Sequence, residues 1–137
     1  MTLLHATVVT IGEAGVALRG PSGAGKTDLA LRLIDAGASL VADDYCEVVA
    51  EAGHVRATPP AAIAGKVEVR GYGIVDMPFR ASARIKLVVD LLPQSEIERM
   101  PENSTTVIEG ITLPCLALDP FTASADAKVR VVLKALP

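Results

Sequence analysis

Gly20-Pro21-Ser22-Gly23-Ala24-Gly25-Lys26-Thr27 is the stretch that decides how this chain is interpreted, because it fits the pattern G-x-x-x-x-G-K-[ST] at every fixed position. Glycines adopt positive φ and carry no Cβ, so successive backbone N–H groups can turn toward one anion. Lys26 can reach the β- and γ-phosphates of a nucleotide, and the Thr27 hydroxyl can ligate Mg²⁺. The stretch therefore predicts a phosphate-binding loop.

The residues on either side of the loop supply the setting that the motif requires. Residues 16–18 are apolar and predict a strand, and residues 28–36 predict a helix with one apolar face formed by Leu29, Ala30, Leu33 and Ile34. Gly37 follows where a helix C-cap belongs. A helix that begins at the loop points its positive end at the same phosphates. This context favours a bound phosphate over a Gly-rich turn without a ligand.

Composition limits the class of protein. The 137 residues are enough for one core, so we expect a single domain over residues 1–137. Half of the residues are hydrophobic but only 3% are aromatic, so the core must consist of Ala, Val, Leu and Ile. A net charge of −3 without a basic block argues against nucleic acid as a partner. Short apolar runs, no visible secretory signal and no C-x-x-C spacing predict a cytoplasmic protein with no membrane partner and two reduced thiols, Cys46 and Cys115.

Periodicity and turn residues predict an α/β domain with a mixed sheet. We expect strands at residues 4–11, 16–18, 39–42, 84–91, 107–108 and 111–118. We expect a hairpin formed by residues 45–49 and 55–58 around a turn at 51–54. The remaining segments predict a short helical turn at 61–65, a loop with strand pieces at 68–74, a mobile loop at 93–104 and a terminal amphipathic helix at 126–136. Hairpins combined with one clear strand–helix crossover favour a mixed sheet.

Two adjacent carboxylates, Asp43 and Asp44, close the buried apolar run at 39–42. Burying both carboxylates would cost a large free energy of desolvation. Near Mg²⁺ one can hold the ion or its waters while the other accepts a proton, although a solvated turn pair is the alternative. Asp90 also follows an apolar strand and is a rival Mg²⁺ contact. We favour the Asp43-Asp44 pair because it comes immediately after one crossover helix from the loop.

Five further polar residues, outside the phosphate loop and the aspartate pair, have separate interpretations that follow from their positions. Glu68 and Arg70 would lie on one face of a strand, either as functional groups or as an exposed ion pair beside a turn. His5 on the first strand is either structural or catalytic, whereas His54 lies in a predicted turn and is expected to be solvated. Arg99 lies in the predicted mobile loop, and a loop arginine that closes over phosphates is a recurrent device.

Taken in order, these motifs resemble the HPr kinase/phosphorylase family, bacterial enzymes that phosphorylate a seryl hydroxyl on HPr, the small phosphocarrier of the sugar phosphotransferase system. The matching stretches cover most of residues 4–120 and are His5, the phosphate loop, Leu40-Val41-Ala42-Asp43-Asp44, Pro59-Pro60 and Glu68-Val69-Arg70-Gly71-Tyr72-Gly73-Ile74. The resemblance implies a P-loop kinase domain like the HPr kinase and PEP carboxykinase nucleotide-binding core. It also implies ATP and Mg²⁺ as cofactors and an HPr-like phosphocarrier as partner.

The resemblance also implies roles for single residues. His5 matches an active-site histidine near the phosphates, and Lys26 matches the lysine of the phosphate loop. Thr27 and Glu68 match Mg²⁺ ligands, although the family commonly has Ser where Thr27 stands. Either Asp43 or Asp44 would be the base that takes the seryl proton and the acid in the reverse phosphorolysis. Arg99 matches a catalytic arginine in a mobile loop. The family core is typically hexameric, so a homo-oligomer is implied.

The chain also departs from the family pattern. Typical members carry an N-terminal domain and extra C-terminal helices, and a Gly-Arg-Asn-like segment linked to phosphorolysis is not evident in this sequence. We therefore expect a short single-domain form with serine kinase activity and at most weak phosphorolysis. One alternative is a nucleotide-binding regulatory module with little turnover. Another is a small-molecule phosphotransferase, which is disfavoured because no second lid domain is visible.

Overall fold

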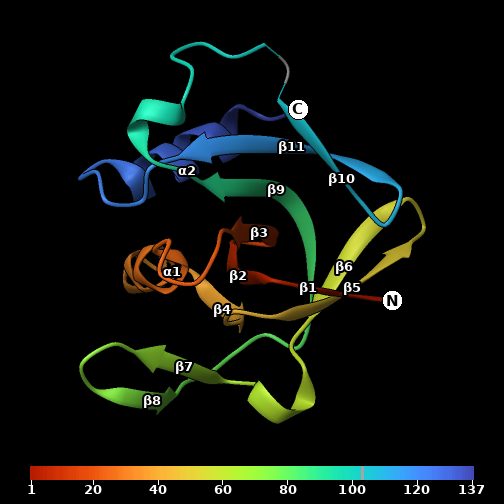
Figure 1. Cartoon of the computed structure of the whole chain (residues 1–137). Helices are drawn as coiled ribbons and strands as arrows, with labels where there is room; N and C mark the ends of the chain where they lie inside the picture. The colour runs from red at the N-terminus through yellow and green to blue at the C-terminus, as the bar shows by residue number, and fades with distance from the viewer. Residues whose placement is uncertain (103) are drawn as a thin grey trace.

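Strands rich in Val, Leu and Ile build a strongly curved mixed sheet around which the molecule is arranged (Figure 1). The computed structural model describes residues 1–102 and 104–137. The main sheet has nine strands in the order β1-β5-β6-β9-β3-β2-β4, with β11 paired to β9 and β10 paired to β11. Its strands are β1 (Thr2–Leu4), β2 (Ala6–Ile11), β3 (Ala14–Arg19), β4 (Ser39–Ala42), β5 (Cys46–Glu51), β6 (His54–Thr58), β9 (Ala83–Leu91), β10 (Thr105–Ile108) and β11 (Ile111–Leu118).

Alternating apolar side chains give this sheet two buried faces. One face lies inside the curl and includes Val8, Ala17, Val41, Val55 and Val88. The other packs against helices α1 (Lys26–Asp35) and α2 (Ala125–Ala135) through a cluster that includes Val16, Leu18, Val89, Leu29, Leu33 and Val129. Among the described residues, the buried hydrophobic side chains are Ala, Val, Leu and Ile apart from Cys46, as composition predicted. The mixed α/β class is thereby confirmed.

The crossover from β3 through α1 to β4 positions the site. Both β3 and β4 pair antiparallel with β2, which lies between them, so β3 and β4 run parallel. Strands β9 and β11 also run parallel to β3. The phosphate loop and Asp43-Asp44 therefore leave the sheet at the same edge, where the carboxyl ends of these strands meet.

Most predicted elements are present, with a few differences. The strand predicted at 4–11 is two strands, because β1 pairs with β5 while β2 pairs with β3 and β4. The predicted hairpin turn is confirmed: Glu51 pairs with His54, and Ala52 and Gly53 have φ of 52° and 78°. The loop with strand pieces predicted at 68–74 is present as the turn of a separate hairpin, in which β7 (Lys66–Val69) pairs with β8 (Gly73–Asp76).

The connecting segments also match in part. The short helical turn predicted at 61–65 is a 3₁₀ turn at Ala61–Ile63. In the segment 93–104, the described residues contain a 3₁₀ turn at Gln94–Glu96, and Asn103 lies outside the described residues. Both cysteines are free, and burial raises the pKa of the Cys46 thiol to about 12. Over residues 1–102 and 104–137, neither helix has the length and apolar character needed to cross a membrane.

Candidate active site

The phosphate loop is built by glycines that no other residue can replace without strain. Gly25 has φ of 100° and lies immediately before the first residue of α1. A Cβ at Gly25 would lie 2.8 Å from Pro120 Cγ and 3.0 Å from Phe121 Cζ. Gly25 is therefore required both by its backbone conformation and by the close approach of the segment between β11 and α2.

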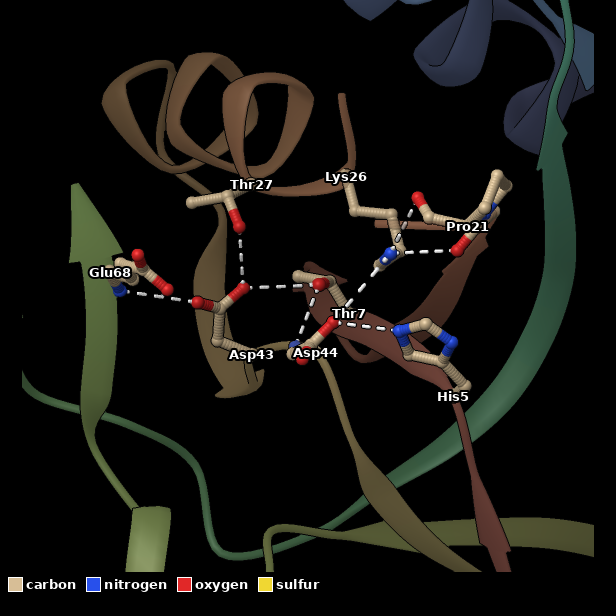
Figure 2. A network of polar contacts seen from close by, with 9 residues as sticks. His5, Thr7, Pro21, Lys26, Thr27, Asp43, Asp44 and Glu68 are labelled. Carbon is tan, nitrogen blue, oxygen red and sulfur yellow. Dashed lines mark hydrogen bonds and ion pairs between the residues drawn. The ribbon is translucent and has the colours of Figure 1, made fainter. Parts of the chain in front are cut away.

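Lys26 is held inside the loop (Figure 2). Its side chain is only 5% exposed, and Nζ donates to the carbonyl oxygens of Gly20 at 2.7 Å and Pro21 at 3.2 Å. The same ammonium lies 3.6 Å from Oδ1 of Asp44. These oxygen partners hold Lys26 Nζ at a fixed point between the loop and the two aspartates.

Asp43 is buried and surrounded by hydrogen-bond donors. Its Oδ1 accepts from the hydroxyls of Thr7 at 3.1 Å and Thr27 at 2.9 Å, and its Oδ2 accepts from the Glu68 backbone N–H at 3.3 Å. Figure 2 shows this carboxylate lying between the Thr27 and Glu68 positions. The three donors offset the cost of burying a carboxylate that is 7% exposed.

Asp44 is the more accessible of the two aspartates. Its side chain is 50% exposed, and its Oδ1 lies 2.8 Å from His5 Nε2. Its backbone has φ of 67°, and the Tyr45 N–H donates to the Asp43 carbonyl at 2.8 Å, which closes a tight turn around Asp44. Such a φ is strained for most residues, although Asp tolerates it better than most. The strained turn therefore fixes the direction of an accessible carboxylate.

Two residues around Asp44 hold it in place. The His5 ring stacks on Tyr45 with ring centroids 4.7 Å apart and planes at 18°. The Thr7 hydroxyl accepts from the Asp44 N–H at 2.9 Å while it donates to Asp43. The sequence analysis did not identify Thr7, because a buried threonine on a Val-rich strand is an ordinary strand residue. Only the pairing of β2 with β4 shows its contact with both aspartates.

Lys26, Thr27 and both aspartates line one cleft of about 620 Å³. Glu68 and Arg70, both exposed, line it from the β7–β8 hairpin, and Phe121 lines it from the segment before α2. The residues present fit a Mg²⁺ ion, since the Thr27 hydroxyl and the Asp43 carboxylate are the oxygen ligands that this ion prefers. Within the described part of the chain no three His, Cys, Asp or Glu side chains form a metal cluster, so waters and phosphate oxygens would complete the coordination.

Asp90, the rival carboxylate, is already paired on another part of the sheet. It accepts from Arg19 Nε at 2.8 Å and Nη2 at 3.0 Å, and the Cys115 thiol lies 3.2 Å away. Burial alone would raise the pKa of Asp90, but the hydrogen bonds from Arg19 and Cys115 and the Arg19 charge together lower it below the ordinary value. Burial and Asp90 in turn raise the pKa of Cys115 to about 11. Side chains two positions apart on a strand lie on the same face of the sheet, so Asp90 shares a face with Val88 and Arg19 shares it with Ala17. That face is opposite the one that packs against α1.

Two other predicted residues lie outside the cleft. Arg99 is exposed and lines a different groove, together with residues of β11 and α2. His54, predicted to be solvated, is half-buried at the start of β6 and lines another cavity with Arg84 and Lys86. The structure thus brings together His5, Lys26, Thr27, both aspartates and Glu68, but it does not bring Arg99 to them.

Asp90→Asn should lower stability without affecting the cleft. The lost ion pair is partly exposed, so we expect a cost of about 1 kcal/mol and a fall of a few degrees in Tm. Because the folded pKa of Asp90 is lowered, its contribution is present above the unfolded pKa near 4 and disappears as pH falls through the folded value. Thermal unfolding from pH 7 to pH 3 should therefore be less pH-dependent in the variant. Nucleotide affinity should stay within about twofold of the wild-type value. A large loss of affinity in a folded variant would show that Asp90 contributes to the nucleotide site.

Comparisons with known proteins agree with one another. The family model for the HPr Serine kinase C-terminal domain matches residues 1–131. The chain is 37% identical over 143 residues to HPr kinase/phosphorylase of Burkholderia lata, covering 93% of this chain and 44% of that protein. It is 42% identical over 77 residues to the protein of the same name from Clostridium novyi, covering 56% of this chain and 25% of that protein.

A solved structure shows the same fold. The structure of the Hpr(Ser) kinase/phosphatase from Coxiella burnetii superposes with a TM-score of 0.88, covering 98% of this chain and 95% of that chain at 23% sequence identity. At that identity the likeness establishes the fold alone. In sequence, the chain spans less than half the length of the curated relatives described above.

Proposed function

This chain belongs to the HPr serine kinase C-terminal domain family, and from that premise we propose that it is a cytoplasmic ATP- and Mg²⁺-dependent kinase that phosphorylates a seryl hydroxyl of an HPr-like phosphocarrier protein. One observation carries the proposal. Asp44 Oδ1 faces the cleft of the phosphate loop, 2.8 Å from His5 Nε2 and 3.6 Å from Lys26 Nζ. A carboxylate at this point can take the proton of a hydroxyl aligned with a phosphoryl donor.

The loop and its helix hold the phosphates. The backbone N–H groups at the start of α1 and the Lys26 ammonium present positive charge to one point of the cleft. Arg70, exposed at the edge of the cleft, supplies a further cation. Because the helix N–H groups and the Lys26 ammonium are fixed before the phosphates arrive, they stabilise the charge that develops during transfer with little reorganisation.

Asp43 serves the metal side of the cleft. Thr27 and Asp43 would hold Mg²⁺ directly or through its waters, with Glu68 contributing from the β7–β8 hairpin. The bound ion neutralises charge on the phosphoryl groups. Asp43 is buried and already accepts three hydrogen bonds, so it orients the Thr27 hydroxyl and does not take the seryl proton.

Asp44 is the base in this proposal, and His5 positions it. The half-exposed carboxylate is open to an incoming hydroxyl, and the His5 ring, stacked on Tyr45, holds Oδ1 toward the cleft. We assign Arg99 no role in the cleft of its own chain, because it lines a different groove. Its family-matched catalytic role stays a prediction for the oligomer, where a neighbouring copy would have to present it.

The test is transfer of labelled phosphate from Mg·ATP to a purified HPr-like protein. We expect one seryl residue of the acceptor to be labelled, and an acceptor with that serine replaced by alanine to stay unlabelled. Incubation of the phosphorylated acceptor with inorganic phosphate should give much slower dephosphorylation than the forward rate. Tight ATP binding without any transfer would contradict the kinase proposal and favour the regulatory module instead.

A further inference from the structure

Phe121 is a large apolar side chain at the edge of a polar cleft. Its side chain is 69% exposed although its ring lies close to the backbone of Gly25, and it lines the same cleft as Ser22, Lys26 and Thr27. The chain has only two phenylalanines and two tyrosines and no tryptophan. An exposed ring beside a phosphate loop is not explained by core packing.

The segment that carries Phe121 is fixed in place. The Asp119 carboxylate accepts from the Phe121 N–H at 3.0 Å and from the Gln94 N–H at 3.2 Å. Arg32, on α1, donates to the carbonyl oxygens of Pro120 and Thr122. The backbone of this segment is thus tied to the helix whose first residues belong to the phosphate loop, so Phe121 is carried beside the loop before any ligand binds.

The order of strands separates the two sides of the loop. Strand β3, which leads into the loop, has β2 and β4 on one side and β9 and β11 on the other. Asp44 follows β4, whereas Phe121 follows β11. Asp44 and Phe121 line the same cleft. A phosphate chain held at the loop with its terminal group toward Asp44 therefore has Phe121 on the opposite side of the loop from that terminal group.

We propose that Phe121 is the platform on which the base of the bound nucleotide stacks, an inference that rests on the proposed function. A flat aromatic ring can stack on the face of a base without hydrogen bonds. Replacing such a stacking ring with alanine weakens nucleic-acid binding substantially, which shows that the stacking contributes to affinity. Both oxygens of the neighbouring Asp119 carboxylate already accept hydrogen bonds from backbone N–H groups. The Phe121 ring is therefore the group of this segment that contacts the base.

The experiment compares Mg·ATP with Mg·tripolyphosphate, which has the phosphates but no base. Calorimetric Kd values are measured for the wild type, Phe121→Ala, Phe121→Tyr and the control Val131→Ala, an exposed apolar side chain on α2. We expect Phe121→Ala to weaken ATP binding about 5- to 150-fold while tripolyphosphate binding changes less than twofold. Phe121→Tyr should keep ATP affinity, and Val131→Ala should change neither ligand.

A spectroscopic readout gives a second test. Phe121→Trp introduces the only tryptophan of the chain, so its fluorescence reports that position alone. ATP should quench it and tripolyphosphate should not. Unchanged ATP affinity in Phe121→Ala, or equal losses of affinity for ATP and tripolyphosphate, would contradict the stacking role of Phe121. Neither result would contradict the kinase proposal. A wild-type chain that binds neither ligand would overturn both.

Discussion

Asp44→Asn should lower the rate of phosphoryl transfer about 10²- to 10⁴-fold, because the amide cannot accept the proton of the seryl hydroxyl. Asn tolerates the positive φ found at this residue, so the fold should be retained. Mg·ATP should bind at least as tightly as to the wild type, since one negative charge near the phosphates is removed. Single-turnover transfer and calorimetric Kd values measure the two effects separately.

Asp43→Asn is the matched comparison. Asp43 touches the Thr27 hydroxyl and is buried, so its loss should first raise the Mg²⁺ concentration needed for half-maximal transfer. The two neighbouring residues thus predict different signatures: a lost rate at saturating Mg²⁺ for Asp44 and a weakened metal dependence for Asp43. If Asp44→Asn transferred phosphate at the wild-type rate, the assignment of the base would be wrong.

The parts of the site that sequence predicts are those set by local chain geometry. The phosphate loop needs glycines at fixed positions, a lysine and a hydroxyl, and all of these lie within one continuous stretch. Asp43 and Asp44 follow the next strand after one crossover helix, so the shared edge of the sheet brings them to the loop. Local motif and simple topology suffice for these residues.

The division of labour between the aspartates depends on contacts across the sheet. Both residues follow the same strand in sequence, and only the pairing of β2 with β4 places Thr7 against Asp43 and His5 against Asp44. The break between β1 and β2 at His5 has no sequence signal either, because the apolar pattern continues across it while the pairing partner changes.

Asp90 and Arg99 show two other limits of sequence reasoning. Asp90 follows an apolar strand as a metal ligand often does, but its partner Arg19 lies 71 residues away and becomes visible only through the pairing of β3 with β9. Arg99 follows a 3₁₀ turn in a segment with no periodic pattern, so its direction relative to the cleft cannot be predicted locally.

Lys26→Ala should abolish measurable phosphoryl transfer and weaken nucleotide binding. Loss of one charge-assisted contact to phosphate costs about 1.5–3 kcal/mol of binding. The transition state should lose more, because negative charge develops where the ammonium is fixed. Transfer from labelled Mg·ATP and calorimetric binding of Mg·ATP measure the two losses.

The burial of Lys26 requires a control for folding. Its removal takes the ammonium donor from the Gly20 carbonyl oxygen, leaves the Pro21 carbonyl oxygen with the Ala24 N–H alone, and takes a cation from the neighbourhood of Asp44. Lys26→Met keeps much of the alkyl stem and removes the charge, so it should lose transfer as fully as Lys26→Ala while keeping more of the thermal stability. Circular dichroism melts establish that each variant is folded. A wild-type rate of phosphoryl transfer in a folded Lys26→Met chain would show that the loop lysine does not act on phosphate. The proposal that this cleft binds the nucleotide would then be wrong.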